Sequence, residues 1–406
     1  MSYVGANTGY IISNIDIGAN LITKDYLIDV YPNIVDQLKT SGLWSWGNNQ
    51  YGQLGDPASL AHRSSPFQLV TGSNWSKVDC QTSSTVAIKT DGTLWLWGNN
   101  IDGKLGLNDR VNRSSPVQVF GGGTWTSISM GSIQVYGIKS DGTLWCWGRN
   151  QYGQLGTNDM VHRSSPVQTV SGGTDWLRVH TDGQVVAAIK TDRTLWTWGS
   201  NQYGQLGSNI RGGGLGIFGR SSPAQLGGTN WKQATCAASS ILAIKTDGTL
   251  WGWGRNNGGT IGINDTIIRS SPVQVGVDTN WKDLAIKGAG AIKTDGTLWG
   301  WGGNQLGAIG DNTNINRSSP VQVVGNATNW LRASMGGGPS AAIKTDGSLW
   351  VWGFNSNFDG RLGTNDYIHR SSPVQTAAGG NNWRAIAIDS GNGFGFAIRD
   401  NSEDFI

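Results

Sequence analysis

The sequence Trp-x-Trp-Gly occurs seven times in this chain and restricts its fold more than any other feature. The copies lie about 50 residues apart and begin at Trp44, Trp95, Trp145, Trp196, Trp251, Trp299 and Trp350. A third tryptophan follows each pair, so the repeat accounts for all 21 tryptophans of the 406 residues. Units with this period bury their apolar faces against their neighbours. The tryptophans are therefore interpreted as packing residues, with none left for a dedicated ligand site.

Each repeat contains a predicted β-hairpin. In "AIKTDGTLWLW", Asp91 and Gly92 supply the positive-φ residues of a tight turn between two strands. The fourth repeat has Asp192 and Arg193 at this place, which predicts a looser turn there. Alternation along "LWLWG" places its two leucines on one side of the strand and its two tryptophans on the other.

Two further strands complete the repeat. "TWTSISM" and "SSPVQV" have the β-branched and apolar residues typical of strands. The proline of the recurring Arg-Ser-Ser-Pro fits the start or edge of a sheet, where no backbone donor is needed. Four strands in about 50 residues, repeated seven times, predict an all-β, seven-bladed β-propeller of four-stranded blades.

The two ends of the chain are predicted to close the ring. "AIRDN" at residues 397–401 matches the first half of the hairpin, and "LWSWG" at Leu43 matches the second half. Together they would complete one blade and leave no free sheet edge. The predicted domains are an N-terminal arm, residues 1–42, and the propeller, residues 43–406.

These motifs resemble the regulator-of-chromosome-condensation repeat family, which forms seven-bladed propellers. The resemblance is carried by Trp-Gly-x-Asn-x-x-Gly-Gln-Leu-Gly at Trp46–Gly55 and Trp147–Gly156, by Arg-x-x-Pro and by the Asp-Gly-Thr-Leu turn. The resemblance covers about residues 43–401. Within the family, this chain is most similar to the phage virion-associated members. Other members act as guanine-nucleotide exchange factors or as adaptors. We see no insertion comparable to the projecting β-wedge of the exchange factor, so the resemblance does not imply exchange activity.

Composition and motifs predict a protein that is not an enzyme and needs no cofactor. Serine-histidine-aspartate signatures, paired glutamates and a phosphate-binding loop are missing from the sequence. The net charge of +3 is weak and its basic residues follow the repeat, so no nucleic-acid partner is expected. No apolar run is long enough to span a bilayer, and the start lacks a secretory signal, so membrane insertion and export are not expected. Three cysteines in different repeats indicate small buried side chains.

Polar side chains recur in the loop before Arg-Ser-Ser-Pro, and each set has two interpretations. His62, His162 and His369 share one loop position in blades 1, 3 and 7 and are separated by the ring geometry, so neither they nor His180 are expected to form a metal site. The aspartates nearby are interpreted as turn caps, because each loop offers too few oxygens for Ca²⁺. The seven arginines could form a ligand ring, or each could bond carbonyls of its own loop, and the second interpretation is favoured. They are Arg63, Arg113, Arg163, Arg220, Arg269, Arg317 and Arg370.

Binding surfaces are predicted where the chain departs from the repeat, because regular positions are occupied by packing. The N-terminal arm is rich in apolar residues, so it either packs on its own propeller or docks on another protein. In the blade-four insertion and the blade-seven loop, aromatic and aliphatic residues stand in polar or Gly-rich stretches. The candidate partner-binding residues are Tyr10, Ile11, Ile12, Tyr26, Leu27, Tyr31, Arg211, Ile217, Phe218, Phe354 and Phe358.

Two function hypotheses follow. The first is a structural phage virion component of the tail or capsid, attached to other particle proteins by its arm and displaying the propeller for protein or host-surface contact. The alternative is a cytoplasmic protein-interaction adaptor or guanine-nucleotide-exchange-type regulator. A secreted-inhibitor hypothesis is disfavoured, because it would need an export signal.

Overall fold

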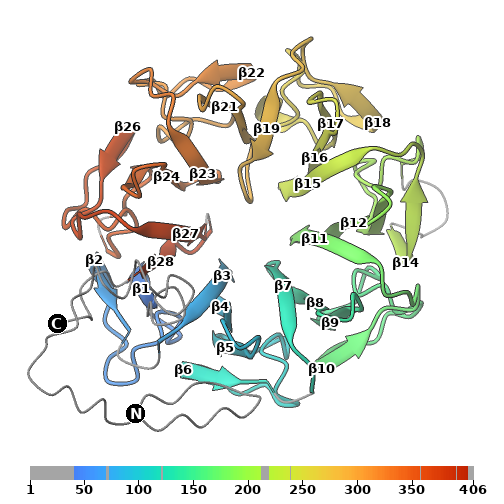
Figure 1. The fold of residues 1–406 in the computed structure, drawn as a ribbon, viewed down its shortest axis with the longest axis horizontal. Coiled ribbons are helices and arrows are strands. Elements are labelled where there is room, and N and C mark those ends of the chain that lie inside the picture. Colours follow the sequence, from blue (N-terminus) through green and yellow to red (C-terminus); the bar gives the residue numbers. More distant parts are fainter. Residues whose placement is uncertain are drawn as a thin grey trace, which may run out of the picture. The chain divides into compact units, whose positions relative to one another are not determined.

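The computed structural model describes residues 41–69, 73–119, 122–211, 219–237, 239–356, 358–389 and 391–400. Within these residues, strands β1 to β28 form seven four-stranded antiparallel sheets, arranged as blades around a central channel (Figure 1). The predicted seven-bladed β-propeller is confirmed. Blades are numbered by their copy of Trp-x-Trp-Gly, and in each blade the strand order runs from the channel outwards.

The strands of each blade, from inner to outer, have these bounds. Blade 1 contains β27 (Trp383–Ile388), β28 (Phe394–Asp400), β1 (Ser41–Gly47) and β2 (Arg63–Gln68); blade 2 contains β3 (Trp75–Gln81), β4 (Ser84–Lys89), β5 (Leu94–Gly98) and β6 (Arg113–Gln118). Blade 3 contains β7 (Trp125–Met130), β8 (Gln134–Lys139), β9 (Leu144–Gly148) and β10 (Arg163–Gln168); blade 4 contains β11 (Trp176–Asp182), β12 (Val185–Lys190), β13 (Leu195–Ser200) and β14 (Gly219–Leu226). Blade 5 contains β15 (Trp231–Ala237), β16 (Ser240–Lys245), β17 (Leu250–Gly254) and β18 (Arg269–Gln274), with the 3-10 helix η1 (Asn257–Gly259) before β18. Blade 6 contains β19 (Trp281–Leu284), β20 (Gly290–Lys293), β21 (Leu298–Gly302) and β22 (Arg317–Gln322); blade 7 contains β23 (Trp330–Met335), β24 (Pro339–Lys344), β25 (Leu349–Gly353) and β26 (Arg370–Gln375).

Blade 1 is closed by strands from both ends of the propeller, as the split hairpin predicts. β1 pairs antiparallel with β28 over the full length of both strands, from Ser41 opposite Asp400 to Gly47 opposite Phe394. The side chains of Phe394, Phe396 and Ile398 on β28 are fully buried. The join is therefore a packed part of the core and not a loose edge.

Seven hydrophobic cores lie between adjacent blades, one for each interface. Alternation along β5 sends Leu94 and Leu96 into the core shared with blade 3, and Trp95 and Trp97 into the core shared with blade 1. The innermost tryptophan, Trp75, meets both tryptophans of β5 with ring centroids 6.1–6.2 Å apart. Each sheet thus buries both faces only because it has a neighbour on each side.

The second tryptophan of each pair also links neighbouring blades through its indole N–H. Trp97 donates to the carbonyl oxygen of Gln53 in the blade 1 loop at 2.8 Å, and Trp147 donates to that of Lys104 in the blade 2 loop at 2.8 Å. Both tryptophans are fully buried, so the donor needs such a partner. The repeat therefore fixes the long loop of one blade onto the core of the next.

The hairpin turn after the second strand depends on an aspartate side chain. In blade 2, Asp91 Oδ1 accepts bonds from the N–H and hydroxyl of Thr93 at 2.8 and 2.7 Å, and Gly92 has a φ of 80°. In blade 4, Arg193 replaces the glycine with a φ of 67°, and its N–H donates to the carbonyl three residues earlier at 3.0 Å, as in blade 2. The expected looser turn is therefore wrong, because Asp192 still makes both bonds to the following threonine.

The inner strand of each blade is an edge of its sheet and faces the channel. Some of its backbone N–H groups therefore have no neighbouring strand to accept a hydrogen bond. A side chain of one blade accepts a bond from an N–H of the next blade's inner strand. These acceptors and donors are Asp79 with Met130 (2.7 Å), Ser129 with Thr181 (3.0 Å), His180 with Cys236 (3.0 Å), Gln233 with Leu284 (3.1 Å) and Ser334 with Ile388 (3.3 Å). Polar side chains on the inner strands thus tie the blades together around the channel.

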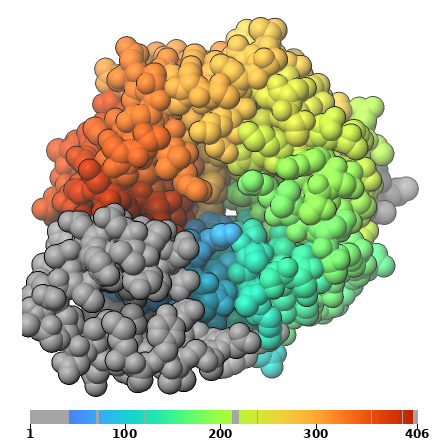
Figure 2. Space-filling view, in the orientation of Figure 1, coloured from blue at the N-terminus to red at the C-terminus, as the bar shows by residue number. Residues whose placement is uncertain are grey.

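Blade 6 departs from this pattern and sends a lysine across the channel. Its two inner strands have only four residues each, and Ile286 forms a parallel bridge with Ser334 of blade 7. The next residue, Lys287, contacts the carbonyl of Cys80 and pairs with Asp79 of blade 2, with Nζ 2.7 Å from Oδ1. β19 and β3 stand on opposite sides of the channel in Figure 1, and Figure 2 shows only a narrow opening at the centre of the ring.

Candidate binding surface

The longest regular loops join the third strand of each blade to its fourth. Because every sheet is antiparallel with the same strand order, these seven loops emerge on the same face of the ring. We call this the connection face. The turns between the first and second strands emerge on it too, whereas the Asp-Gly turns lie on the opposite face.

Each connection is held by an asparagine at its base, as blade 3 shows. Asn150 Oδ1 accepts from the N–H of Leu155 at 2.8 Å, and its amide donates to Asp159 Oδ1 at 3.1 Å. Asp159 in turn pairs with Arg163, the first residue of β10, at 2.6 Å. Six of the seven arginines pair with an aspartate of their own loop, so the main partner is a carboxylate and not the carbonyl expected from the sequence. Arg113, Arg163 and Arg269 also donate to a loop carbonyl. Arg220 of blade 4 has no aspartate in its connection.

The loop histidines belong to the same scaffold. Nδ1 of His162 accepts the N–H of Asn150 at 2.9 Å, and His62 and His369 do the same in blades 1 and 7. Blades 2 and 6 place Asn112 and Asn316 at this position, and their side-chain oxygens accept the equivalent bond at 2.8 Å. Because an asparagine replaces the histidine without changing the bond, the imidazole acts here as a hydrogen-bond acceptor.

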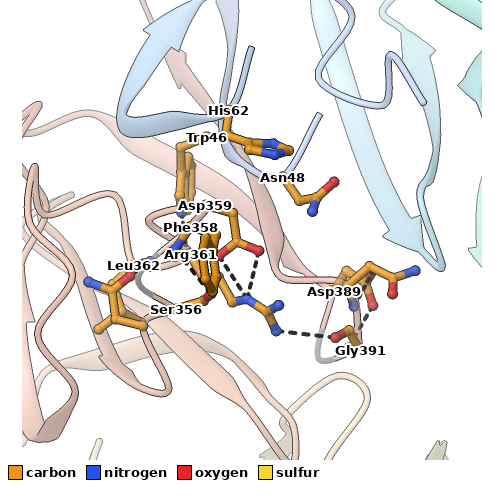
Figure 3. Close-up of polar contacts among 12 residues, drawn as sticks. Trp46, Asn48, His62, Ser356, Phe358, Asp359, Arg361, Leu362, Asp389 and Gly391 are labelled. Atoms are coloured by element: carbon orange, nitrogen blue, oxygen red, sulfur yellow. Dashed lines mark hydrogen bonds and ion pairs between the residues drawn. The ribbon is translucent and has the colours of Figure 1, made fainter. Parts of the chain in front are cut away.

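The first part of the blade 7 connection, from its asparagine to the next buried aliphatic residue, contains two more residues than in the other blades. Leu362 donates to an asparagine seven residues earlier, whereas the equivalent span in blades 1 to 6 is five. Figure 3 shows how the insertion is held: Arg361 pairs with Asp359 at 2.9 Å and donates to the carbonyl of Gly391 at 3.2 Å. The Arg361 carbonyl accepts the indole N–H of Trp46 at 2.9 Å. Arg361 therefore fixes the loop to blade 1 twice, through its side chain at Gly391 and through its carbonyl at Trp46.

The two aromatic residues predicted in this loop have different environments. Phe358 is 83% exposed in the insertion, so its ring lies in solvent. Phe354 is half-buried, with its ring 5.1 Å from that of His369 and the Arg361 guanidinium 4.7 Å from its centroid. Phe358 thus offers a free apolar contact, and Phe354 supports the loop beneath it.

The other predicted contact residues fall into two groups. Arg211 is exposed at the end of the described part of the blade 4 connection and donates to the carbonyl of Ile268 in blade 5 at 2.9 Å. The remaining residues lie outside the described residues: Ile217, Phe218, Tyr10, Ile11, Ile12, Tyr26, Leu27 and Tyr31. The structure therefore places Arg211 and Phe358 on the same face but in different blades.

Sequence reasoning missed an apolar residue that recurs in the connection of every blade. The side chains are between 56% and 64% exposed and are Leu60, Val111, Val161, Ile210, Ile267, Ile315 and Ile368. We call them the aliphatic rim. The signal was present in the sequence, because five of the seven stand two residues before the Arg of Arg-Ser-Ser-Pro.

Two titratable groups near the channel have unusual pKa values. Burial lowers the pKa of His180 to about 4, so its imidazole is neutral near pH 7 and Nδ1 is free to accept from Cys236. Burial also lowers the pKa of Lys104 to about 8. The Lys104 ammonium donates to the carbonyls of Thr82 and Ser132 at 2.7 and 3.2 Å. A hollow of about 310 Å³ beside Lys104 therefore presents an occupied cation and not a free anion-binding group.

The described residues contain no group of three or more histidine, cysteine or acidic side chains placed to hold a metal ion. Cys80, Cys146 and Cys236 are buried free thiols, and burial raises the pKa of each. In the part of the chain that the structure describes, no helix is long and apolar enough to cross a membrane.

The fold and its loops define a propeller built from repeats of the RCC1 type. The model of the RCC1-like domain family matches residues 42–397, and the chain belongs to this family. The Arabidopsis thaliana ultraviolet-B receptor UVR8 is 27% identical over 242 residues, which are 57% of this chain and 53% of the receptor. The chain therefore matches about half the length of this relative.

Solved structures share the same ring. Human WBSCR16 has a TM-score of 0.78 and 20% identity, covering 90% of this chain and 100% of that one. Yeast RCC1 (Prp20), solved with Kap60 bound, has a TM-score of 0.76 and 16% identity, covering 90% of both chains. At these identities the likeness shows the fold alone.

Proposed function

We propose that this chain is a non-enzymatic scaffold that binds another protein through the connection face. The observation that carries the proposal is Phe358, an exposed ring held on an insertion that the other blades lack. Exposed aromatic anchors on a rigid support are the residues that dominate protein interfaces. Yeast RCC1 was solved with a bound protein, Kap60, which supports protein binding as a use of this fold.

The family and the similar proteins named above favour the adaptor hypothesis over the virion hypothesis. Neither the family nor the three relatives named above carries a description of a virion component. A place in a virion, attachment by the arm at residues 1–42 and contact with a host surface stay predictions. We also propose that guanine-nucleotide exchange is absent, because the described loops form no projecting β-wedge. Nucleotide release from a small GTPase, catalysed by the purified protein, would contradict this.

A photocrosslinking amino acid at position 358 would identify the partner, and binding would then be measured with both proteins purified. Removing a central aromatic anchor typically costs about 2 kcal/mol or more, so Phe358→Ala should weaken binding by about thirtyfold. The matched control is Val277→Ala, which truncates an exposed apolar residue after β18, on the opposite face, and should leave binding unchanged. Equal affinity of Phe358→Ala and the original protein would remove the proposed contact.

A further inference from the structure

The aliphatic rim places one exposed apolar side chain in the connection of every blade. In blades 2, 3, 5, 6 and 7 it stands two residues before the Arg of Arg-Ser-Ser-Pro, so the repeat puts these five side chains at corresponding positions of the connection face. Leu60 and Ile210 occupy other positions of their loops, as the bonds from Asn49 and Asn201 show. Isolated exposed aliphatic residues need no explanation, but one in every blade on the same face does.

Hydrogen bonds fix the backbone that carries the rim. In blade 3 the N–H of Val161 donates to Asp159 Oδ1 at 3.0 Å, and its carbonyl accepts from Arg163 at 3.1 Å. The N–H groups of Val111, Ile267 and Ile368 are held in the same way, and Ile315 uses a threonine hydroxyl. The rim is thus positioned before any ligand arrives, which lowers the entropy lost on binding.

The charges around the rim favour an anionic partner. On the described connections, every carboxylate except that of Asp102 has an arginine partner. By contrast, Arg110, Arg149, Arg211 and Arg255 have no carboxylate partner among the described residues. Of these, Arg149 bonds a glutamine, Arg211 bonds a carbonyl and Arg255 lies over a tyrosine ring. The connections therefore carry more arginines than carboxylates without an oppositely charged partner, and these arginines lie in the same loops as the apolar side chains.

We propose that the connection face docks on the surface of an anionic lipid bilayer, with the aliphatic rim entering the headgroup region. A flat bilayer is a partner that corresponding side chains on one face of a ring can contact together. Aliphatic residues beside basic residues are the combination that binds anionic interfaces. A second copy of the chain, placed face to face, would instead bring the same unpaired arginines together.

This inference goes beyond the proposed protein scaffold and does not depend on it. Phe358 lies on the same face, so a bilayer and a protein partner would compete for access to blade 7. Lipid binding through blades 2 to 6 and protein binding at Phe358 can be removed separately, because different residues carry them.

The test is cosedimentation of the full chain with vesicles of phosphatidylcholine containing about 30% phosphatidylserine. The protein should bind these vesicles and not pure phosphatidylcholine, and rising salt should weaken the binding. Replacing Val111, Val161, Ile267 and Ile315 together with serine should reduce binding about tenfold or more. Arg149→Gln, Arg211→Gln and Arg255→Gln together should lower binding and its dependence on salt.

The matched control is the double variant Val170→Ser and Val277→Ser. These exposed valines follow outer strands β10 and β18, so they lie on the opposite face, and binding should be unchanged. Equal melting temperatures for all variants would show that the fold is retained. The proposal is overturned if the original protein does not sediment with anionic vesicles, if the rim variant binds as well as the original, or if the control loses as much. It is also overturned if the rim variant loses only the protein partner.

Discussion

At the scale of the residue, His180 connects protonation to the integrity of the ring. Its unprotonated Nδ1 accepts the N–H of Cys236, and burial lowers its pKa to about 4 from about 6.5. Protons therefore bind the unfolded chain more readily, and the stabilisation is complete above pH 6.5 and lost as the pH falls towards 4. We expect protonation of His180 to lower the free energy of unfolding by at most about 3 kcal/mol over that range. The loss should be smaller than this, because the side chain is partly exposed to the channel.

The measurement is chemical denaturation at several pH values for the original protein and His180→Gln. Glutamine keeps an acceptor for the same N–H, as Gln233 shows in blade 5, but does not titrate. The variant should therefore lose less stability between pH 6.5 and pH 4. Parallel curves for the original protein and His180→Gln would contradict the assignment.

At the scale of the element, β28 determines whether the ring is closed. Deleting residues 394–406 removes Phe394, Phe396 and Ile398, each worth about 1.5–3 kcal/mol of burial. Their sum is comparable to the whole stability of a typical domain, so the truncated chain should not melt cooperatively above room temperature. Deleting only residues 401–406 leaves β28 intact and serves as control. A cooperative transition near that of the full chain, followed by circular dichroism, would show that blade 1 does not need β28.

Most elements could be predicted from the sequence because local signals repeat seven times. The Asp-Gly turn, the alternating Leu and Trp and the split hairpin each gave a correct strand or pairing. The turn at Arg193 could not, because the bonds that hold it come from Asp192 and not from the glycine. The short strands of blade 6 also escaped prediction, since their place is set by the bridge to blade 7.

At the scale of the whole molecule, Lys287 and Asp79 join blades that are not neighbours. Breaking a buried pair leaves an unpaired charge, so Lys287→Met should lower the free energy of unfolding by about 3–5 kcal/mol. Combining it with Asp79→Asn should recover most of this loss, because asparagine can still accept the N–H of Met130 without a buried charge. Chemical denaturation of the two single variants and the double variant gives the coupling free energy between Lys287 and Asp79. Simple additivity of the two single effects would show that the pair does not act across the channel.

The candidate surface was less predictable than the ring. Phe358 was found because it breaks the repeat, and Phe354 was named with it although the structure turns it onto His369. The aliphatic rim was overlooked for the opposite reason: it obeys the repeat and was attributed to packing. Whether a regular position faces the core or solvent depends on the path of a long connection, which alternation in strands does not describe.

The closing pair of β1 with β28 also has a consequence for biosynthesis. β1 is the first strand of the ring to leave the ribosome and β28 is the last, so β1 has no inner partner until the seventh blade has been made. Blades 2 to 7 each consist of consecutive strands and have all their segments earlier. Throughout translation the nascent chain therefore carries an unpaired β1 edge, and chaperone binding during synthesis would matter most at that strand.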